Sequence, residues 1–224
     1  MAINWLKLNR VNFKMIPKPT ISRICMIYKL LGDLETAGIE SVSSSEIGSE
    51  LGLSPHSIRK DFTFLKDINS TGSKYNVSKL KKQIGLNLNI ETTRKACIVG
   101  LGRLGSALLK YDKFTESGYI IEAGFDSSVN LIETLHTRIK LYPSYQIPEI
   151  VKTKNIELGI IAVPAEAAQG VADRLIEGGI KGIVNFAPYI INTSSSKVHV
   201  SNIDVVKEFT ILSALIGLDE NTKS

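Results

Sequence analysis

The sequence predicts an α/β protein in which an N-terminal winged-helix domain precedes a Rossmann domain with a doubly wound parallel sheet and a C-terminal helix. Three observations predict this architecture. Segments with helix-turn-helix spacing occupy the first 85 residues, a strand runs into a glycine-rich turn at 100–105, and strands alternate with helices after it. We expect an extension at 1–15, a winged helix at 16–85, a linker at 86–94, a Rossmann domain at 95–202 and a C-terminal helix and tail at 203–224.

The composition is that of a globular protein. The chain has 224 residues, of which 43% are hydrophobic, so it can bury a sizeable core in one or two domains. Its two cysteines, Cys25 and Cys97, lie far apart and outside any CxxC pattern, which favours a reducing compartment. No apolar run approaches the roughly 20 residues that a membrane-spanning helix needs. We expect a cytoplasmic protein whose residues 1–14 are either a disordered extension or a mis-assigned start.

Positive charge is concentrated in the front of the chain. Residues 1–95 hold 15 Lys and Arg against 8 Asp and Glu, whereas residues 96–224 hold 12 against 14. A basic front half favours a polyanionic partner such as DNA. A basic surface that is only solvated is the alternative.

Three short helices are predicted in the front half. The first runs from Thr20 to near Gly38, because apolar residues recur there at spacings of three and four: Ile21, Ile24, Ile27, Tyr28, Leu31 and Leu34. The second begins at the serine caps of residues 43–45 and stops at Gly52. The third begins at Ser54, since serine caps exposed amides and the following proline is tolerated in the first helical position.

The third helix has the character of a recognition helix. Its inner stripe is apolar and its outer face can reach base edges and phosphates in a major groove. The inner residues are Ile58, Phe62 and Leu65. A tight turn at 69–75 between two short strands is the expected wing, and a helix at 77–84 follows it and ends at Gly85. The predicted DNA contacts are Ser44, Ser54, His56, Ser57, Arg59, Lys60, Ser73 and Lys74. A purely structural helical hairpin is the alternative.

A glycine-rich turn follows the first strand of the back half. The strand at 95–99 leads into Gly100, Gly102 and Gly105, and a helix continues through residues 107–109. The first glycine permits a tight turn, the second lets a pyrophosphate approach the backbone, and the third lets helix and strand pack closely. The helix N-terminus then faces the phosphates. A glycine turn that binds nothing is the alternative.

A carboxylate at the end of the second strand strengthens the prediction of a dinucleotide site. The strand at 120–125 ends in Asp126, which can accept both hydroxyls of a ribose. Ser127 and Ser128 follow it without an arginine for a 2′-phosphate, so NADH and NAD⁺ are favoured over their phosphorylated forms.

Two later loops are expected to border the nicotinamide. Strands at 158–163 and 182–185 flank a helix at 165–177, and ligands in doubly wound sheets bind beyond the carboxyl ends of strands. Either loop can instead be simple packing. The predicted cofactor contacts are Gly100, Gly102, Arg103, Leu104, Gly105, Tyr111, Asp126, Val163, Pro164, Ala165, Asn185, Phe186 and Asp204.

No catalytic or metal-binding group stands out. A dehydrogenase needs a positioned acid or base, but His56, His136 and His199 lie where an exposed or structural role is expected. No metal-ligand cluster or Ser/His/Asp arrangement is visible. We therefore expect a regulator that is not an enzyme. An NAD-dependent oxidoreductase with a basic accessory domain is the alternative.

The C-terminal segment at 205–218 is an amphipathic helix with a strongly apolar face. That face contains Val206, Phe209, Leu212, Leu215 and Ile216. Such a helix needs a partner, which periodicity cannot identify: it packs either on its own subunit or on a second one.

Taken in order along the chain, these residues resemble the Rex family of redox-sensing repressors. The resemblance runs from about Ile16 to Leu218. Its specific stretches are Ile16-Pro17, Ile21-Ser22-Arg23, Val42-Ser43-Ser44, Ile58-Arg59-Lys60-Asp61, residues 100–109 with Tyr111, Val163-Pro164-Ala165, Ala167-Ala168-Gln169, residues 179–183, Asn185-Phe186-Ala187-Pro188 and Ile203-Asp204.

The resemblance implies a homodimer with a swapped C-terminal helix. It implies that Arg59 and Lys60 contact operator DNA, that residues 100–105 hold the pyrophosphate and that Asp126 holds the adenosine ribose. It also implies a redox relay in which Arg23 and Tyr111 form a network with Asp204 of the partner subunit. The function that follows is repression, in which NADH releases a palindromic operator. A DNA-binding module whose Rossmann domain serves only for dimerisation is a further alternative.

The sequence departs from the family pattern after the recognition helix and in the wing. Residues 64–66 are Phe-Leu-Lys where the family has Tyr-Phe-Gly, and the wing at 71–75 lacks the family's arginine. Arginine is favoured in narrow minor grooves, so operator affinity or preference is expected to differ. Ser128 replaces a second aspartate after Asp126, and Val205 follows Asp204 where a larger residue occurs, which leaves cofactor selectivity open.

Overall fold

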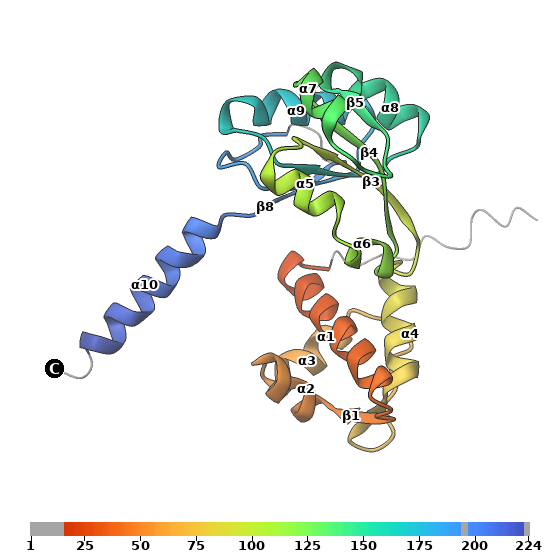
Figure 1. Ribbon diagram of the computed structural model, residues 1–224. Coiled ribbons are helices and arrows are strands. Elements are labelled where there is room, and N and C mark those ends of the chain that lie inside the picture. Colours follow the sequence, from red (N-terminus) through yellow and green to blue (C-terminus); the bar gives the residue numbers. More distant parts are fainter. Residues whose placement is uncertain (1–15, 194–196, 222–224) are drawn as a thin grey trace, which may run out of the picture. The chain divides into compact units, whose positions relative to one another are not determined.

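The computed structural model describes residues 16–193 and 197–221, which form two compact units (Figure 1). The boundary between the units falls between Glu91 and Thr92, inside the segment at 86–94 that was expected to connect two domains. Each unit has its own hydrophobic core.

The N-terminal unit consists of helices and a small sheet. Its elements are α1 (Lys18–Thr36), β1 (Ser41–Ser43), α2 (Ser44–Leu51), α3 (Pro55–Phe62), β2 (Lys74–Asn76) and α4 (Val77–Leu88). Strands β1 and β2 pair in antiparallel register. Buried residues from all four helices form the core, in which the ring of Phe62 on α3 packs edge-on against Tyr75 at 5.3 Å between centroids. The expected three-helix arrangement with a following strand is therefore present.

Local hydrogen bonds explain where α2 and α3 begin and end. The Ser43 hydroxyl accepts from the Glu46 amide at 3.1 Å, and the Glu46 carboxylate accepts from the Ser43 amide at 2.6 Å. This reciprocal pair is a capping box. Gly52 ends α2 in the left-handed conformation at φ 66°. Ser54 caps α3 by accepting from the Ser57 amide at 3.1 Å, so the predicted starts of both helices are confirmed.

Two expectations for this unit are wrong in detail. The helix expected to end at Gly85 continues to Leu88 and ends at Asn89, which takes the left-handed conformation. A side chain on Gly85 would collide with the side chain of Glu91, so this glycine permits a close contact between α4 and the segment that follows it. In the expected wing, only the second strand forms. Strand β2 pairs with the distant β1, while a single bridge between Thr71 and Lys74 closes the turn.

The C-terminal unit is built on a six-stranded parallel sheet in the order β5-β4-β3-β6-β7-β8. The strands are β3 (Arg94–Val99), β4 (Tyr119–Asp126), β5 (Leu141–Pro143), β6 (Leu158–Ile161), β7 (Gly182–Asn185) and β8 (His199–Asn202). The chain starts in the middle, winds outward to β5 and then returns to wind outward on the other side. This order is the doubly wound topology that the alternation of strands and helices predicts.

Helices cover both faces of this sheet (Figure 1). They are α5 (Arg103–Leu109), α6 (Lys113–Glu116), α7 (Val129–Thr134), the 3₁₀ turn η2 (Ser144–Gln146), α8 (Ile147–Thr153) and α9 (Ala165–Glu177). Apolar residues of α8 and α9 belong to one core cluster, whereas those of α5 and α6 belong to another. Ligands of such sheets bind where the chain reverses direction between the two halves, at the carboxyl ends of β3 and β6.

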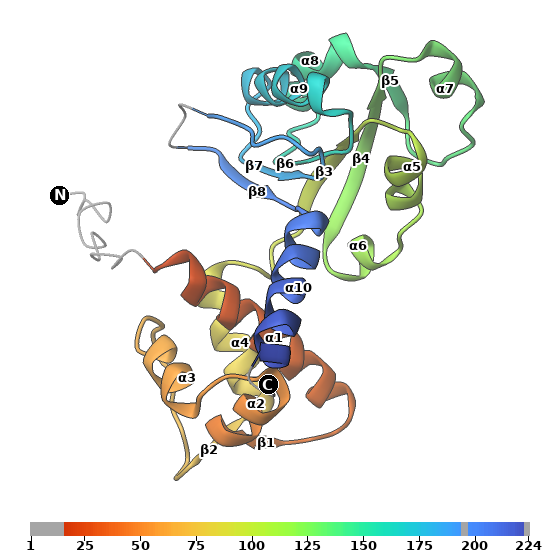
Figure 2. The same ribbon diagram turned by 90° about the vertical axis from the view of Figure 1, so that its left-hand side faces the viewer.

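The last helix, α10 (Val205–Asn221), follows β8 as one continuous helix (Figure 2). None of its described residues is buried. The five residues of the predicted apolar face are all more than half exposed, with Val206 at 75% and Phe209 at 67%. No described helix is both long and apolar enough to cross a membrane.

Two glycines allow α5 to approach the sheet. A Cβ atom on Gly105 would lie 1.8 Å from the carbonyl oxygen of Gly100. Gly100 itself has φ of 90°, and a Cβ there would lie 2.5 Å from the carbonyl oxygen of Ala162. Because backbone atoms cannot yield as side chains do, both positions require glycine.

We predict that Gly105→Ala lowers the free energy of unfolding by about 3 kcal/mol or more, since overpacking against backbone displaces α5 from β3. The measurement is urea unfolding followed by circular dichroism. Gly102→Ala is the matched control, because its added methyl group meets nothing within 4 Å. Equal unfolding midpoints for the two variants would contradict the packing described here.

Candidate functional site

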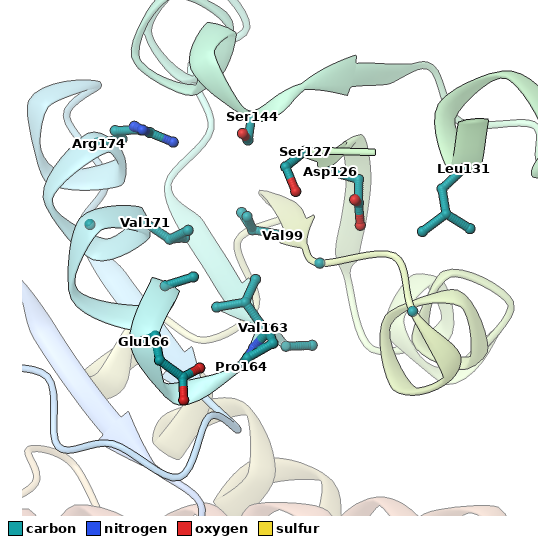
Figure 3. Close-up of a pocket in the computed structure, with 15 residues that line it drawn as sticks. Val99, Asp126, Ser127, Leu131, Ser144, Val163, Pro164, Glu166, Val171 and Arg174 are labelled. Atoms are coloured by element: carbon teal, nitrogen blue, oxygen red, sulfur yellow. The ribbon is translucent and has the colours of Figure 1, made fainter. Parts of the chain in front are cut away.

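A cavity of about 410 Å³ opens at the carboxyl ends of β3, β4 and β6 (Figure 3). Five of the predicted cofactor contacts line it: Gly100, Gly102, Asp126, Val163 and Pro164. These residues come from three separate strand-to-helix loops, so the fold assembles them as the doubly wound topology predicts. The cavity is large enough for a substantial part of a dinucleotide.

The glycine turn leaves one side of the cavity open to a phosphate group. Gly102 stands at the N-cap position of α5, and no side chain caps that helix. A Cβ on Gly102 would project into empty space, so its absence leaves room for a ligand next to the backbone. A pyrophosphate needs such a close approach to backbone amides. The turn therefore fits the group that its sequence predicts.

Asp126 is anchored by two backbone amides. Its Oδ2 accepts from Leu101 at 2.6 Å, and its Oδ1 accepts from Ser128 at 2.8 Å. The first bond ties the end of β4 to the glycine turn. Each carboxylate oxygen has two lone pairs, so both oxygens keep an acceptor site for a ribose hydroxyl. The carboxylate is thus held in place in the cavity wall, a support that the sequence did not indicate.

The remaining predicted cofactor contacts do not line this cavity. They are Arg103, Leu104, Gly105, Tyr111, Ala165, Asn185, Phe186 and Asp204. Asn185 is fully buried, and its side-chain amide donates to Tyr189 at 2.7 Å and to Asn202 at 2.9 Å. Its oxygen accepts from the Ala187 amide at 3.0 Å. Asn185 therefore holds the loop after β7 together, which is the packing role left open above.

The sequence also missed residues that line the cavity. They are Ser127, Leu131, Ser144, Glu166, Ala167, Gly170, Val171 and Arg174, together with Val99 and Ala162. Those on α9 recur at spacings of three and four, so helical periodicity combined with the position of α9 after β6 was the available signal.

Five of the eight predicted DNA-binding residues lie on α3 or at its N-cap, and two others lie before or at the start of β2. His56, Arg59 and Lys60 are exposed on this helix. Ser54 caps it, and the Ser54 hydroxyl also donates to the Ser57 hydroxyl at 2.8 Å. Ser73 is exposed in the turn, and Lys74 pairs with Glu46 at 3.2 Å. These residues form an exposed polar and basic surface of the kind that can contact phosphates and base edges.

Ser44 and Arg59 contact each other. Arg59 Nη1 donates to the Ser44 hydroxyl at 2.8 Å, and Ser44 is only 6% exposed. Ser44 is therefore in a position to orient the guanidinium. A long side chain that is already oriented loses less entropy on binding than a free one.

Arg23 is partly exposed and binds two buried residues, Asp61 and Thr20. Its Nε and Nη2 donate to Asp61 Oδ2 at 2.6 Å and to Oδ1 at 2.7 Å, and the Thr20 hydroxyl donates to Oδ1 at 3.0 Å. The hydrogen bond with Asp61 raises the pKa of Arg23 above its usual value. Asp61 is 2% exposed, so the pair joins α1 to α3 through a buried carboxylate.

The other two predicted relay residues have local contacts. Tyr111 is 56% exposed and packs edge-on against Phe114 at 5.5 Å between centroids. Asp204 Oδ1 accepts from the Lys207 amide at 3.0 Å, at the start of α10. The side chains of His56, His136 and His199 are all exposed. Among the described residues no group of three or more His, Cys, Asp and Glu is arranged to hold a metal ion.

Comparison with known proteins covers nearly the whole chain. Residues 15–63 match the family described as putative DNA-binding protein N-terminus, and residues 91–189 match the CoA binding domain family. The redox-sensing transcriptional repressor Rex of Carboxydothermus hydrogenoformans is 37% identical over 204 residues, which is 91% of this chain and 98% of the relative. The same repressor of Desulfitobacterium hafniense is 34% identical over 90% of this chain and 96% of the relative.

Solved structures of a Rex-family repressor called RSP are similar as well. The complex of RSP with NAD⁺ and operator DNA has a TM-score of 0.84 at 26% identity, covering 93% of this chain and 96% of RSP. The complex with NADH has a TM-score of 0.82 at 25% identity, covering 93% of this chain and 98% of RSP. With relatives this similar over nine-tenths of its length, the chain belongs to the Rex family of redox-sensing transcriptional repressors.

Proposed function

We propose that this chain is a repressor that binds operator DNA through its N-terminal unit and is released when its C-terminal unit binds NADH. The observation that carries the proposal is the combination, in one chain, of an exposed basic helix, α3, and a cavity that opens beside the glycine turn and contains Asp126. The relatives named as redox-sensing repressors, and RSP with NADH or with NAD⁺ and operator DNA, support it. NADH is then a sensed ligand, and the chain acts as a cytoplasmic regulator without consuming it.

In the C-terminal unit, residues 100–105 hold the pyrophosphate and Asp126 holds the adenosine ribose. The open space beside Gly102 and the free lone pairs of the anchored carboxylate support this assignment. The nicotinamide side is bordered by residues at the carboxyl ends of β6 and β7, namely Val163, Pro164, Ala165, Asn185 and Phe186. Asn185 contributes by holding its loop in shape.

In the N-terminal unit, α3 enters the major groove. Arg59 and Lys60 supply the cationic contacts, and His56 and Ser57 lie on the same helix. Ser73 approaches from the turn before β2, and Lys74 approaches from the first position of that strand. Ser44 acts through Arg59, because a serine that is 6% exposed cannot itself reach a DNA duplex. Contacts to phosphates give affinity, and contacts to base edges give specificity.

The active form is a homodimer in which α10 packs on a second subunit. A 17-residue helix without a buried residue and with a continuous apolar face is a large exposed hydrophobic surface, and such surfaces mark interfaces. A symmetric dimer presents two recognition helices to the two halves of a palindrome.

The state of the cofactor reaches the DNA-binding surface through Arg23, Tyr111 and the partner's Asp204. Arg23 donates hydrogen bonds to Asp61 and Thr20 through Nε and Nη2. Its Nη1 is therefore the atom that a second carboxylate would approach. To move a dimer from 99:1 to 1:99 between two arrangements, NADH must bind the second about 5.5 kcal/mol more tightly than the first.

We predict that saturating NADH raises the apparent Kd for operator DNA at least tenfold. The duplex is one that the protein selects from a random pool, and fluorescence anisotropy measures its binding at fixed ionic strength, because phosphate contacts make affinity depend on salt. Asp126→Ala is the comparison: it should bind the duplex and lose the response to NADH. An unchanged Kd in the wild-type protein would overturn the proposed function.

We predict that Ser44→Ala weakens operator binding by about 3- to 10-fold, the effect of one lost hydrogen bond to a charged group. The substitution removes the acceptor that orients Arg59. Its control is Ser45→Ala, a neighbouring exposed serine on the same helix. NADH titrations should be identical for both variants, and equal DNA affinity in the two would rule out the positioning role of Ser44.

We predict that replacing both Phe209 and Leu212 by serine converts a dimer into a monomer, since both side chains are exposed in the single chain and an interface would bury them. Sedimentation velocity gives the mass of each species. Ser213→Ala is the control on the same helix. A variant that keeps twice the mass of the chain would show that α10 does not form the interface.

A further inference from the structure

Helix α9 supplies one complete wall of the cavity. Glu166, Gly170 and Arg174 are four residues apart and line it together with Ala167 and Val171. A Cβ on Gly170 would meet nothing within 4 Å, so the middle of this wall is flat and open. Val171 is buried and offers an apolar surface beside it. The wall thus has an apolar middle, an acidic end at Glu166 and a basic end at Arg174.

The order of groups in a dinucleotide determines what this wall faces. Gly102 marks the position of the pyrophosphate, and Asp126 marks the position of the ribose that carries the adenine. The adenine is attached to that ribose and lies on its far side from the pyrophosphate. The part of the lining that remains there is Ser127, Leu131, Ser144 and the Arg174 end of the α9 wall, which lies across the cavity from Asp126 (Figure 3).

Arg174 is available for contact with a ligand. Figure 3 shows its guanidinium extending from α9 toward Ser144 along the rim of the cavity. Among the described residues no ion pair joins Arg174 to a carboxylate. Its neighbour Asp173 accepts instead from Gln169 at 2.8 Å, on a different face of α9.

The chemistry of the rim favours an aromatic base over a further phosphate. A guanidinium is flat, delocalised and weakly hydrated, so it stacks well on aromatic rings. A phosphate on the adenosine ribose would instead lie beside the anchored carboxylate of Asp126, where like charges repel. The adenine ring suits both Arg174 and the apolar surface of Val171.

We propose that Arg174 stacks on the adenine ring of the bound dinucleotide and sets the affinity for its adenosine half. This inference rests on the proposed function in two respects, namely that the cavity takes NADH and that Gly102 and Asp126 lie at its pyrophosphate and its adenosine ribose. It concerns a residue on a helix distant in sequence from the glycine turn and Asp126.

The test compares Arg174→Ala and Arg174→Lys with the wild-type protein by calorimetric titration. The ligands are NADH, NADPH, which carries a further phosphate on the adenosine ribose, reduced nicotinamide mononucleotide, which lacks the adenosine half, and AMP, which lacks the nicotinamide half. Arg138→Ala is the matched control, because Arg138 is an exposed arginine of the same unit that lines a different hollow. Circular dichroism verifies that each variant melts as the wild type does.

Arg174→Ala should weaken NADH and AMP binding by about 3- to 30-fold, the range expected for a cation stacked on an aromatic ring. The mononucleotide should bind unchanged, and Arg138→Ala should match the wild type. Arg174→Lys should behave like Arg174→Ala, because lysine keeps the charge and loses the flat surface.

Three results would overturn the inference: unchanged NADH affinity in Arg174→Ala, equal weakening of NADH and the mononucleotide, or wild-type affinity in Arg174→Lys. A loss that is larger for NADPH than for NADH would also overturn it, because the guanidinium would then serve a phosphate. Wild-type protein that binds NADH without releasing operator would defeat the proposed function while leaving this inference supported. Wild-type protein that fails to bind NADH would defeat both.

Discussion

The close approach of α5 to β3 is the contact on which the nucleotide site depends. Gly105 lies against the carbonyl of Gly100, and any side chain there would force the helix away from the sheet. At this distance the glycine turn is tight enough for the Leu101 amide to reach Asp126 on the neighbouring strand. The turn proposed to hold the phosphates and the carboxylate proposed to hold the ribose are therefore joined by a hydrogen bond, which couples their positions.

Features governed by local chemistry could be predicted from the sequence. The starts of α2 and α3 follow from serine caps, the turn before α5 follows from its glycines, and the order of the strands follows from their alternation with helices. Contacts between distant residues could not be predicted in the same way. Nothing in the sequence near Asp61 indicates Arg23, and nothing near Ser44 indicates Arg59, because each pair meets only when separate helices pack.

The incorrect expectations have the same cause. Gly85 reads locally as the end of a helix, but Glu91 folds back over it and the helix continues. The presence of Arg174 in the cavity could not be predicted for a similar reason, because α9 brings it there from a position far along the chain from Asp126. Side chains that complete a site often lie on the wall opposite the motif, and a motif search does not extend there.

Helix α3 is held within the N-terminal unit by side-chain hydrogen bonds to two other helices. Asp61 holds it to α1 through Arg23, and Arg59 holds it to α2 through Ser44. Breaking a fully buried ion pair costs about 3 to 5 kcal/mol, and this pair, whose arginine side chain is 29% exposed, costs less. A signal that reoriented α3 within the N-terminal unit would still use a substantial part of the difference of about 5.5 kcal/mol that a nearly complete switch requires. Release of operator DNA therefore requires less free energy if each N-terminal unit moves as a rigid body. Helix α3 then stays unchanged inside its unit, and only the spacing between the two α3 helices of the dimer changes.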